Sequence, residues 1–272
     1  MSSFIKGFFD INRRLCERVE ARLPADFLIN LHRSYEAAAS QALNTNKNWT
    51  VLDIGAGRNC PYMRFLKADR GHRIVAIDVD EDELRHNAAV SFRVVADAVK
   101  SLPVSDRSVD FISARSVMEH ISDTRRYMRN CANALKPGGY VIQSFPCRFA
   151  PFAALNRILP NRLARALLHY LYPEWRVDCG FRAFYDNCYP SAMQRILEEN
   201  NLEIVHSELR YYEAIYYTFF LPLYVVMVAY DLIAWRIGVK NLACQMLFVA
   251  RKKAATVTSI PDERMSHETT SA

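Results

Sequence analysis

Between residues 49 and 145 the chain alternates short apolar segments with segments of helical pattern. This alternation restricts the fold more than any other feature of the sequence. The apolar segments have the length of buried strands and lie at 49–54, 73–78, 92–95, 109–113 and 140–145. Helical patterns lie between them at 60–68, 81–87 and 124–135. Strands that alternate with helices form βαβ units, with helices on both faces of a parallel sheet. We therefore predict an α/β fold with a doubly wound, mostly parallel sheet.

The chain on either side of this region has a different organisation. Two N-terminal helices are expected within residues 1–48: one over 4–23, ended by Pro24, and one over 27–44, capped by Asp26. A long insertion with one basic helix at 155–171 is expected at 147–190, followed by a helix at 191–200. Strands are expected at 202–209 and 244–250, with an apolar aromatic segment at 214–235 between them. The chain thus divides into segments 1–48 and 49–253 and a polar tail, 254–272, expected to be disordered.

A glycine turn follows the first predicted strand, in the sequence Val-Leu-Asp-Ile-Gly-Ala-Gly at 51–57. Glycines allow the backbone to approach a ligand closely, and a helix that starts beyond the turn offers free N–H groups. Three acids lie at the ends of successive strands: Asp53, Asp78 and Asp97. Open α/β sheets bind ligands at this edge, where an acid after the second strand accepts ribose hydroxyls. The turn therefore predicts a site for an adenosine-containing cofactor.

Several motifs together resemble class I S-adenosylmethionine-dependent methyltransferases. These are the 51–57 turn, the acid Asp78, Ala-Asp-Ala at 96–98, Asp-Phe-Ile-Ser at 110–113, Met-Glu-His-Ile at 118–121 and Leu-Lys-Pro-Gly-Gly-Tyr at 135–140. The resemblance is close over 49–145 and looser over 191–250. It implies a seven-stranded sheet whose last strand is antiparallel, with the N-terminal helices and the helical insertion added to this domain. It also implies S-adenosyl-L-methionine as the cofactor.

The resemblance implies roles for matching positions only. Asp53 and the backbone of Gly55, Ala56 and Gly57 would hold the methionine part of the cofactor. Asp78, followed by Val79, would hold the ribose, and Asp97 with Ala98 would hold the adenine. The backbone at Arg115 and Ser116 would face the sulfonium. Many members have a further glycine near Asn59, which this chain lacks.

His120 is the candidate for a catalytic base, because it lies just past the fourth strand. Methyl transfer by in-line displacement depends mainly on alignment, although an oxygen or nitrogen nucleophile can also need a base. A structural or cofactor-lining role for His120 stays open. The insertion segment 173–185 mixes charge, aromatic residues and glycine, as a pocket lid would, and a packed loop is the alternative interpretation.

Composition and charge limit the kinds of cofactor and substrate that we expect for this chain. The chain has 272 residues, a net charge of +6 and seven cysteines without metal-ligand spacing, so we expect no metal site. There is no dense Lys/Arg run, and a nucleic-acid substrate is not expected. Because the sequence opens without a secretory pattern, we expect a cytoplasmic setting. The oligomeric state is open. The acceptor is expected to be a small or amphiphilic, lipid-like molecule.

The segment 214–235 is almost long enough to span a bilayer, but Pro222, Asp231 and its place between two strands of one sheet argue against a span. It is expected either to be a buried helix or to form an apolar entrance resting on a membrane. The first helix favours peripheral membrane contact through Phe4, Ile5, Phe8 and Phe9 beside Lys6, Arg13 and Arg14. Two other functions remain. One is an NAD(P)-dependent oxidoreductase, which is disfavoured by Cys60 three places after the second glycine and by the placement of Asp53 and Asp97. The other is a non-catalytic cofactor-binding scaffold.

Overall fold

A mixed seven-stranded sheet forms the centre of the computed structural model, which describes residues 3–90, 92–172 and 181–254. The strand order is β3-β2-β1-β4-β5-β7-β6. The strands are β1 (Thr50–Ile54), β2 (Arg73–Asp78), β3 (Phe92–Val95), β4 (Val109–Arg115), β5 (Leu135–Pro146), β6 (Leu202–Arg210) and β7 (Gln245–Lys252). The first five strands are parallel, and β7 runs antiparallel to both β5 and β6. The predicted fold class is confirmed.

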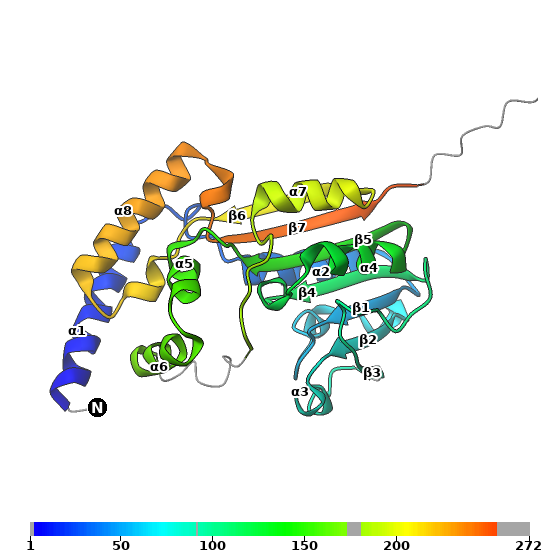
Figure 1. Ribbon diagram of the computed structural model, residues 1–272, viewed down its shortest axis with the longest axis horizontal. Helices are drawn as coiled ribbons and strands as arrows, with labels where there is room; N and C mark the ends of the chain where they lie inside the picture. The colour runs from blue at the N-terminus through cyan, green and yellow to red at the C-terminus, as the bar shows by residue number, and fades with distance from the viewer. Residues whose placement is uncertain (1–2, 91, 173–180, 255–272) are drawn as a thin grey trace, which may run out of the picture.

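Helices cover both faces of the sheet (Figure 1). One face is covered by α4 (Thr124–Ala134) and α7 (Pro190–Glu199), whose apolar side chains join a core with β1, β4 and β5. The other is covered by α2 (Leu31–Thr45), where four side chains at four-residue steps are fully buried: Leu31, Tyr35, Ala39 and Leu43. This spacing gives α2 one continuous apolar stripe, which packs it against β5 and β7.

A third apolar cluster lies beyond the sheet and joins segments far apart in sequence. It contains side chains of α1 (Ser3–Glu20), of the chain after β6, and of α8 (Leu221–Ile237). The carboxylate of Asp231 on α8 accepts the N–H groups of Glu213 and Ala214 at 2.7 and 2.8 Å. These bonds fix the short helix η5 (Ala214–Tyr217) to α8. Figure 1 shows α1 and α8 together at one end of the molecule, next to α5 (Pro151–Ile158) and α6 (Asn161–Leu171).

Three predicted helices differ from the structure. The segment 60–68 contains no α-helix, only the 3₁₀ turn η1 (Met63–Phe65), and a second turn, η2 (Ala68–Arg70), follows. Asn44 explains this, because its side-chain amide bonds the carbonyl of Phe65 and the N–H of Lys67, which a longer helix would use internally. The second N-terminal helix starts later than expected and is capped by Asn30, not Asp26.

The basic helix expected at 155–171 is also two helices, α5 and α6, which meet at Leu159 and Pro160. Proline disfavours a helical conformation in the residue before it, so the break falls at this pair. The remaining described helix is the short α3 (Glu81–Arg85), whose cap Asp80 accepts two N–H groups. The predicted lid residues 173–180 and the predicted disordered tail from 255 onward lie outside the described residues.

Candidate cofactor site

The glycine turn is held by a backbone bond to the second strand and by the side-chain amide of Asn87. The N–H of Gly55 donates to the carbonyl of Ile77 at 2.7 Å, and Asn87 donates to the carbonyl of Gly57 at 3.1 Å. Both glycines have a left-handed backbone, with φ of +65° and +48°. A Cβ on Gly55 would lie 2.2 Å from Val117, while the space around Gly57 is open. The turn therefore needs glycine at 55 for packing and leaves room for a ligand at 57.

Asp53 is buried at the end of β1, with 4% of its surface exposed. Its Oδ1 accepts the hydroxyl of Ser113 at 2.7 Å, and Ser113 also bonds the hydroxyl of Tyr62 at 2.8 Å. Burial raises the pKa of the Asp53 carboxyl to about 6, although Ser113 and the nearby Arg115 oppose this rise. A carboxylate in this environment gains most from a bound cation, because water no longer stabilises its charge.

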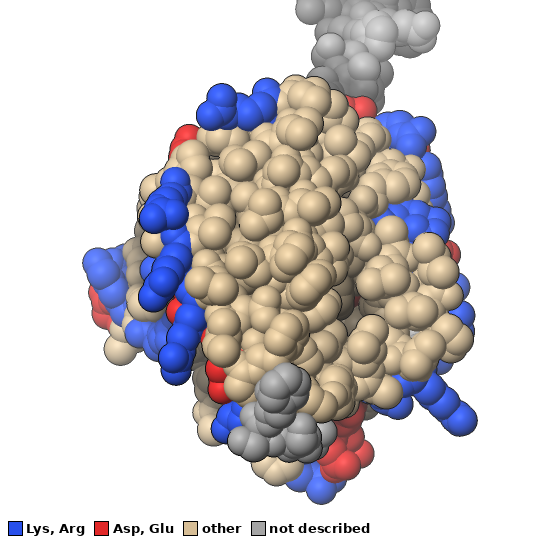
Figure 2. Space-filling view, turned by 90° about the vertical axis from the view of Figure 1, so that its left-hand side faces the viewer, with Lys and Arg blue, Asp and Glu red and all other residues tan. Residues whose placement is uncertain are grey.

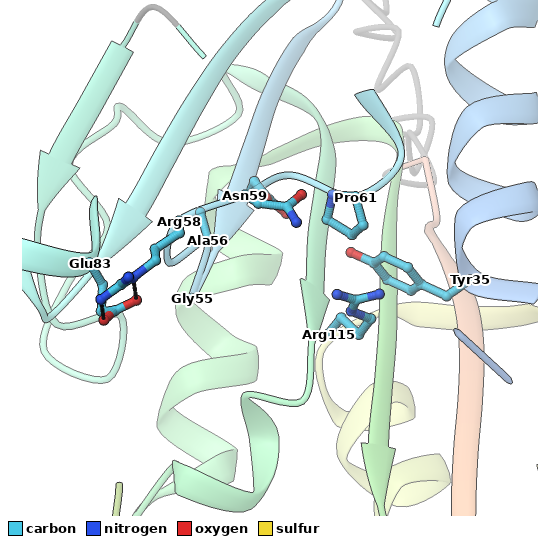
Figure 3. Close-up of a pocket in the computed structure, with 9 residues that line it drawn as sticks. Tyr35, Gly55, Ala56, Arg58, Asn59, Pro61, Glu83 and Arg115 are labelled. Carbon is cyan, nitrogen blue, oxygen red and sulfur yellow. Dashed lines mark hydrogen bonds and ion pairs between the residues drawn. The ribbon is translucent and has the colours of Figure 1, made fainter. Parts of the chain in front are cut away.

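A pocket of about 240 Å³ opens beside Asp53 and the glycine turn. Figure 3 shows Tyr35 and Arg115 on one side of it and the ion pair of Arg58 with Glu83 on the other. The Arg115 guanidinium lies 3.4 Å from a carboxylate oxygen of Glu36 on α2. The pocket thus has a buried acid on its floor and a cation at its edge, which suits the ammonium and carboxylate of an amino acid.

Asp78 connects this pocket to the open rim of the sheet. Its Oδ2 accepts the N–H of Gly57 at 2.8 Å, and its Oδ1 accepts the N–H of Asp80 at 3.0 Å. Each carboxylate oxygen has a second lone pair, so both can accept a further hydroxyl. The next residue, Val79, leaves 57% of its surface exposed although it is apolar. An exposed apolar side chain beside an acid with free acceptor capacity suits a ribose carrying a planar base.

Asp97 and Ala98 follow β3, next to the end of β2. Asp78 pairs with Val95 in the sheet, and the carbonyl of Asp78 accepts the N–H of Ala96 at 2.9 Å. Oδ1 of Asp97 accepts the N–H of Val99 at 3.0 Å, which forms a tight turn. The structure therefore brings the second and third acids to neighbouring positions, as the sequence predicted from the strand ends. Ala98 is buried in the core, so only its backbone is available to a ligand.

Ser116 lies directly after β4 in a left-handed backbone, with φ of +55°. Non-glycine residues rarely adopt this conformation, and such strain occurs often at functional sites. The N–H of Ser116 donates to the carbonyl of Ser144 at 2.7 Å, which joins the ends of β4 and β5. The 3₁₀ turn η3 (Met118–His120) begins two residues later. The end of β4 thus places Arg115 at the pocket and His120 further out.

His120 is part of a second group of polar residues. Its Nδ1 lies 3.0 Å from the carbonyl of Arg182, and burial lowers its pKa. A carbonyl only accepts, so Nδ1 carries the proton and the neutral ring has its lone pair on Nε2, which lies 4.0 Å from a carboxyl oxygen of Glu119. The adjacent Glu119 is buried, and burial raises its pKa to about 8. Its backbone carbonyl accepts the N–H groups of Phe184 and Tyr185, which fixes the end of the insertion to η3.

Sequence reasoning missed five residues that line the pocket and one that pairs with Arg115. The five are Tyr35, Arg58, Asn59, Pro61 and Glu83, and the one that pairs with Arg115 is Glu36. The apolar stripe of α2 marks Tyr35 as buried, but nothing in the sequence indicates that α2 lies over the glycine turn. The pairing of Arg58 with Glu83 joins segments on two different strand ends. Contacts of this kind depend on the order of strands in the sheet.

Comparisons with known proteins agree with this geometry. A model of the methyltransferase domain family matches residues 16–207, which is more than half of the chain. The chain belongs to the S-adenosylmethionine-dependent methyltransferase family. A probable S-adenosylmethionine-dependent methyltransferase of Mycolicibacterium smegmatis is 34% identical over 105 residues. That match covers 37% of this chain and 40% of the relative, so the chain aligns with less than half of that protein.

Two further proteins extend the likeness. Demethylmenaquinone methyltransferase of Tropheryma whipplei is 29% identical over 155 residues, covering 53% of this chain and 63% of the relative. The crystal structure of an S-adenosylmethionine-dependent methyltransferase from Mesorhizobium loti superposes with a TM-score of 0.50 at 19% identity, covering 82% of this chain and all of that one. At this identity the structural likeness supports the fold alone. The family's cofactor, S-adenosylmethionine, fits the charges and open space of the site described above.

Proposed function

We propose that this protein is an S-adenosylmethionine-dependent methyltransferase that methylates a small or amphiphilic acceptor. The observation that carries the proposal is the alignment of Asp53, Asp78 and Asp97 along one edge of the sheet, beside a glycine turn with open space. When bound, the cofactor supplies an electrophilic methyl group whose thioether leaving group needs no proton. The protein then gains rate chiefly by aligning the acceptor with that methyl group.

The methionine end of the cofactor would lie in the pocket. There the Asp53 carboxylate would pair with the ammonium, the Arg115 guanidinium would pair with the carboxylate, and the backbone of Gly55 to Gly57 would line the chain between them. Each charged pair gains from the low exposure of Asp53 and from fixed positions of the partners. This assignment uses the Arg115 side chain, whereas the sequence suggested only its backbone.

The adenosine end would lie along the rim. Asp78 would accept the two ribose hydroxyls, Val79 would cover the adenine ring, and Asp97 with the backbone of Ala98 would bond the edge of the ring. The turn backbone at Ser116 would face the transferring methyl group.

His120 is the proposed base for an acceptor that must lose a proton. Its Nε2 carries the lone pair, and its lowered pKa keeps the ring neutral at physiological pH. At saturating S-adenosylmethionine, where the titration of Asp53 no longer limits cofactor binding, kcat should therefore rise with pH through the lowered pKa of His120 and stay constant above it. In the variant His120→Asn this rise should disappear and kcat should fall, with unchanged affinity for S-adenosylhomocysteine. An unchanged pH profile of the variant would exclude the base role.

Support for an amphiphilic acceptor comes from the chain beyond β5 and β6. Phe152 on α5 and Tyr216 on η5 stack with ring centroids 4.1 Å apart, on the same side of the sheet edge as the site. One relative is named for a quinone acceptor, demethylmenaquinone. We infer a cytoplasmic enzyme whose acceptor is lipid-like and is reached at a membrane surface.

A dinucleotide oxidoreductase is less consistent with the structure. Dinucleotide sites place the pyrophosphate at the N-terminus of a helix that follows the glycine turn. Among residues 55–72, all of which are described, the chain forms only the 3₁₀ turns η1 and η2. The glycine turn therefore offers no helix N-terminus to a pyrophosphate.

Methyl transfer is tested with radiolabelled S-adenosylmethionine, the purified protein and two cell fractions, one lipid-soluble and one aqueous. We expect label in the lipid-soluble fraction, and its absence with the variant Asp78→Asn. Label only in the aqueous fraction would contradict the lipid-like acceptor. Binding of S-adenosylhomocysteine without transfer to either fraction would instead indicate a non-catalytic scaffold.

A further inference from the structure

The outward face of α8 is apolar although it lies on the surface. Its buried side includes Tyr224, Val228, Asp231 and Ala234, which pack on the third cluster. On the other side, more than two fifths of the surface of each of four aliphatic side chains is exposed: Val225, Val226, Ile233 and Ile237. A surface helix of a globular protein normally turns charged or polar residues to water. The outward face of α8 therefore resembles a face that contacts something other than water.

Two neighbouring helices extend this face. On α1, Phe8 and Ile11 are exposed, and on α6, Leu163, Leu167 and Tyr170 are exposed. The rings of Phe9 and Tyr170 pack edge to face with their centroids 6.4 Å apart, which joins α1 to α6. We call the exposed apolar side chains of α1, α6 and α8 the apolar end. Figure 2 shows this end as a broad surface without charged side chains at its centre.

Basic side chains surround the apolar end. Figure 2 shows Lys and Arg along much of its margin, with Asp and Glu at fewer places. Exposed basic residues on or next to the three helices are Lys6, Arg14, Arg18, Arg162, Arg165, Arg236 and Lys240. The only acid of α8, Asp231, is buried and bonded to backbone N–H groups, and α6 has no acid. The acids of α1 are Asp10, Glu17 and Glu20, of which only Glu17 is exposed, so basic side chains outnumber acidic ones around the apolar end. An apolar surface with a cationic margin is complementary to a bilayer surface that carries anionic headgroups.

The apolar end lies at the edge of the sheet where the cofactor site opens. Arg115 at the end of β4 pairs with Ser144, and two residues further along β5 Pro146 pairs with Gln245 at the start of β7. Gln245 also pairs with Arg210, the last residue of β6. The chain leaves β6 here for η5 and α8 and leaves β5 here for α5 and α6. A surface bound at the apolar end would therefore lie next to the acceptor side of the site.

We propose that the apolar end docks on the surface of an anionic lipid bilayer and receives the methyl acceptor from it. The second half of this proposal rests on the proposed methyltransferase function, whereas the docking does not. A second copy of the chain is a poorer occupant, because the cationic margins of two copies would repel each other. No helix in the described part of the chain is long and apolar enough to cross a bilayer. Docking is thus interfacial, with the inner side of α8 held in the protein.

Vesicle flotation tests the docking, with phosphatidylcholine vesicles that either contain or lack phosphatidylglycerol. We expect the full-length protein to float with the anionic vesicles and at least tenfold less with the neutral ones. The double variant Val226→Glu with Ile233→Glu should lose at least tenfold in partitioning, because two side chains that enter the interface become charged. The double variant Arg162→Gln with Arg165→Gln should weaken binding to anionic vesicles only.

Val205→Glu is the matched control, because Val205 is an exposed valine, at 51% against 62% for Val226, but lies on β6 and not on the three helices. It should float like the wild type. Thermal unfolding and binding of S-adenosylhomocysteine verify that each variant is folded. Failure of the wild type to float with anionic vesicles, or equal flotation of the α8 variant, would overturn the docking. The docking would also be overturned if the wild type bound no vesicle but sedimented as a dimer, and if the α8 variant abolished that dimer.

The docking proposal and the proposed methyltransferase function can be refuted independently of each other. If the protein floats but transfers no methyl group to detergent-solubilised extract, the docking is supported and the proposed enzyme function is refuted. If the protein methylates solubilised extract but never floats, the enzyme function is supported and the docking is refuted.

Discussion

Titration of Asp53 should control cofactor affinity. The carboxyl is 4% exposed, and burial raises its pKa from an ordinary 3.8 to about 6. If only the ionised form pairs with the cofactor's ammonium, about nine tenths of the protein is competent near pH 7 and about one tenth near pH 5. The affinity for S-adenosylhomocysteine should therefore fall about tenfold between these values. Isothermal titration calorimetry at several pH values measures this directly.

The stability of the free protein should change in the opposite direction. The folded state of Asp53 binds its proton more tightly than the unfolded state, so its contribution to stability is greatest below about pH 4. It is lost as the pH rises to about 6, by roughly 3 kcal/mol for a shift of about two pKa units. Denaturant unfolding of the variant Asp53→Asn, compared with the wild type over this range, isolates the Asp53 contribution.

The same variant separates Asp53 from other groups that face it. Arg115 lowers the pKa of Asp53 and Asp78 raises it, while Ser113 and Cys60 lower it through hydrogen bonds. Asparagine retains an acceptor for the hydroxyl of Ser113 but cannot ionise. Asp53→Asn should bind weakly at every pH, with a flat profile between about pH 5 and pH 7. A wild-type affinity that is constant over this range, or a variant with the wild-type slope, would refute the assignment.

Three further predictions concern single positions. Gly55→Ala should destabilise the protein and weaken cofactor binding, because its Cβ would lie 2.2 Å from Val117; adding Val117→Ala should restore part of the melting temperature, and no recovery would contradict the packing argument. Asp78→Asn should lower affinity for S-adenosylhomocysteine roughly tenfold to hundredfold by calorimetry, since charge-assisted bonds to the ribose are lost. The control Asp82→Asn, on the exposed helix α3, should leave this affinity unchanged. An equal loss of affinity in both variants would reject the ribose role of Asp78. Asp231→Ala should cost roughly 2–4 kcal/mol in denaturant unfolding, because two buried N–H groups of η5 lose their acceptor; a loss within experimental error would show that those groups find other partners.

The parallel strands were predictable because each is a short apolar run bounded by polar or glycine residues. β2 and β3 have the predicted boundaries, Arg73–Asp78 and Phe92–Val95. The acids at the strand ends were predictable for the same reason, since parallel strands end at one edge. The positions of Asp53, Asp78 and Asp97 thus follow from local pattern and one rule of topology.

Features that depend on contacts distant in sequence were not predictable. The absence of a helix at 60–68 depends on Asn44, which belongs to another helix. The position of Tyr35 at the pocket depends on where α2 lies on the sheet. The exposed side of α8 could not be identified either, because the helix is apolar on nearly all sides and only the packing of Tyr224 and Val228 shows which side is inward. In a helix that is apolar on nearly all sides, the spacing of apolar residues does not show which side is buried.

Calorimetric titration of the purified chain with S-adenosylhomocysteine and, separately, with NAD tests the central claim most directly. The account predicts saturable one-to-one binding of S-adenosylhomocysteine, weakened in Asp78→Asn and Asp53→Asn, and no binding of NAD. Binding of NAD in preference to S-adenosylhomocysteine, or no binding of S-adenosylhomocysteine to the folded protein, would contradict it.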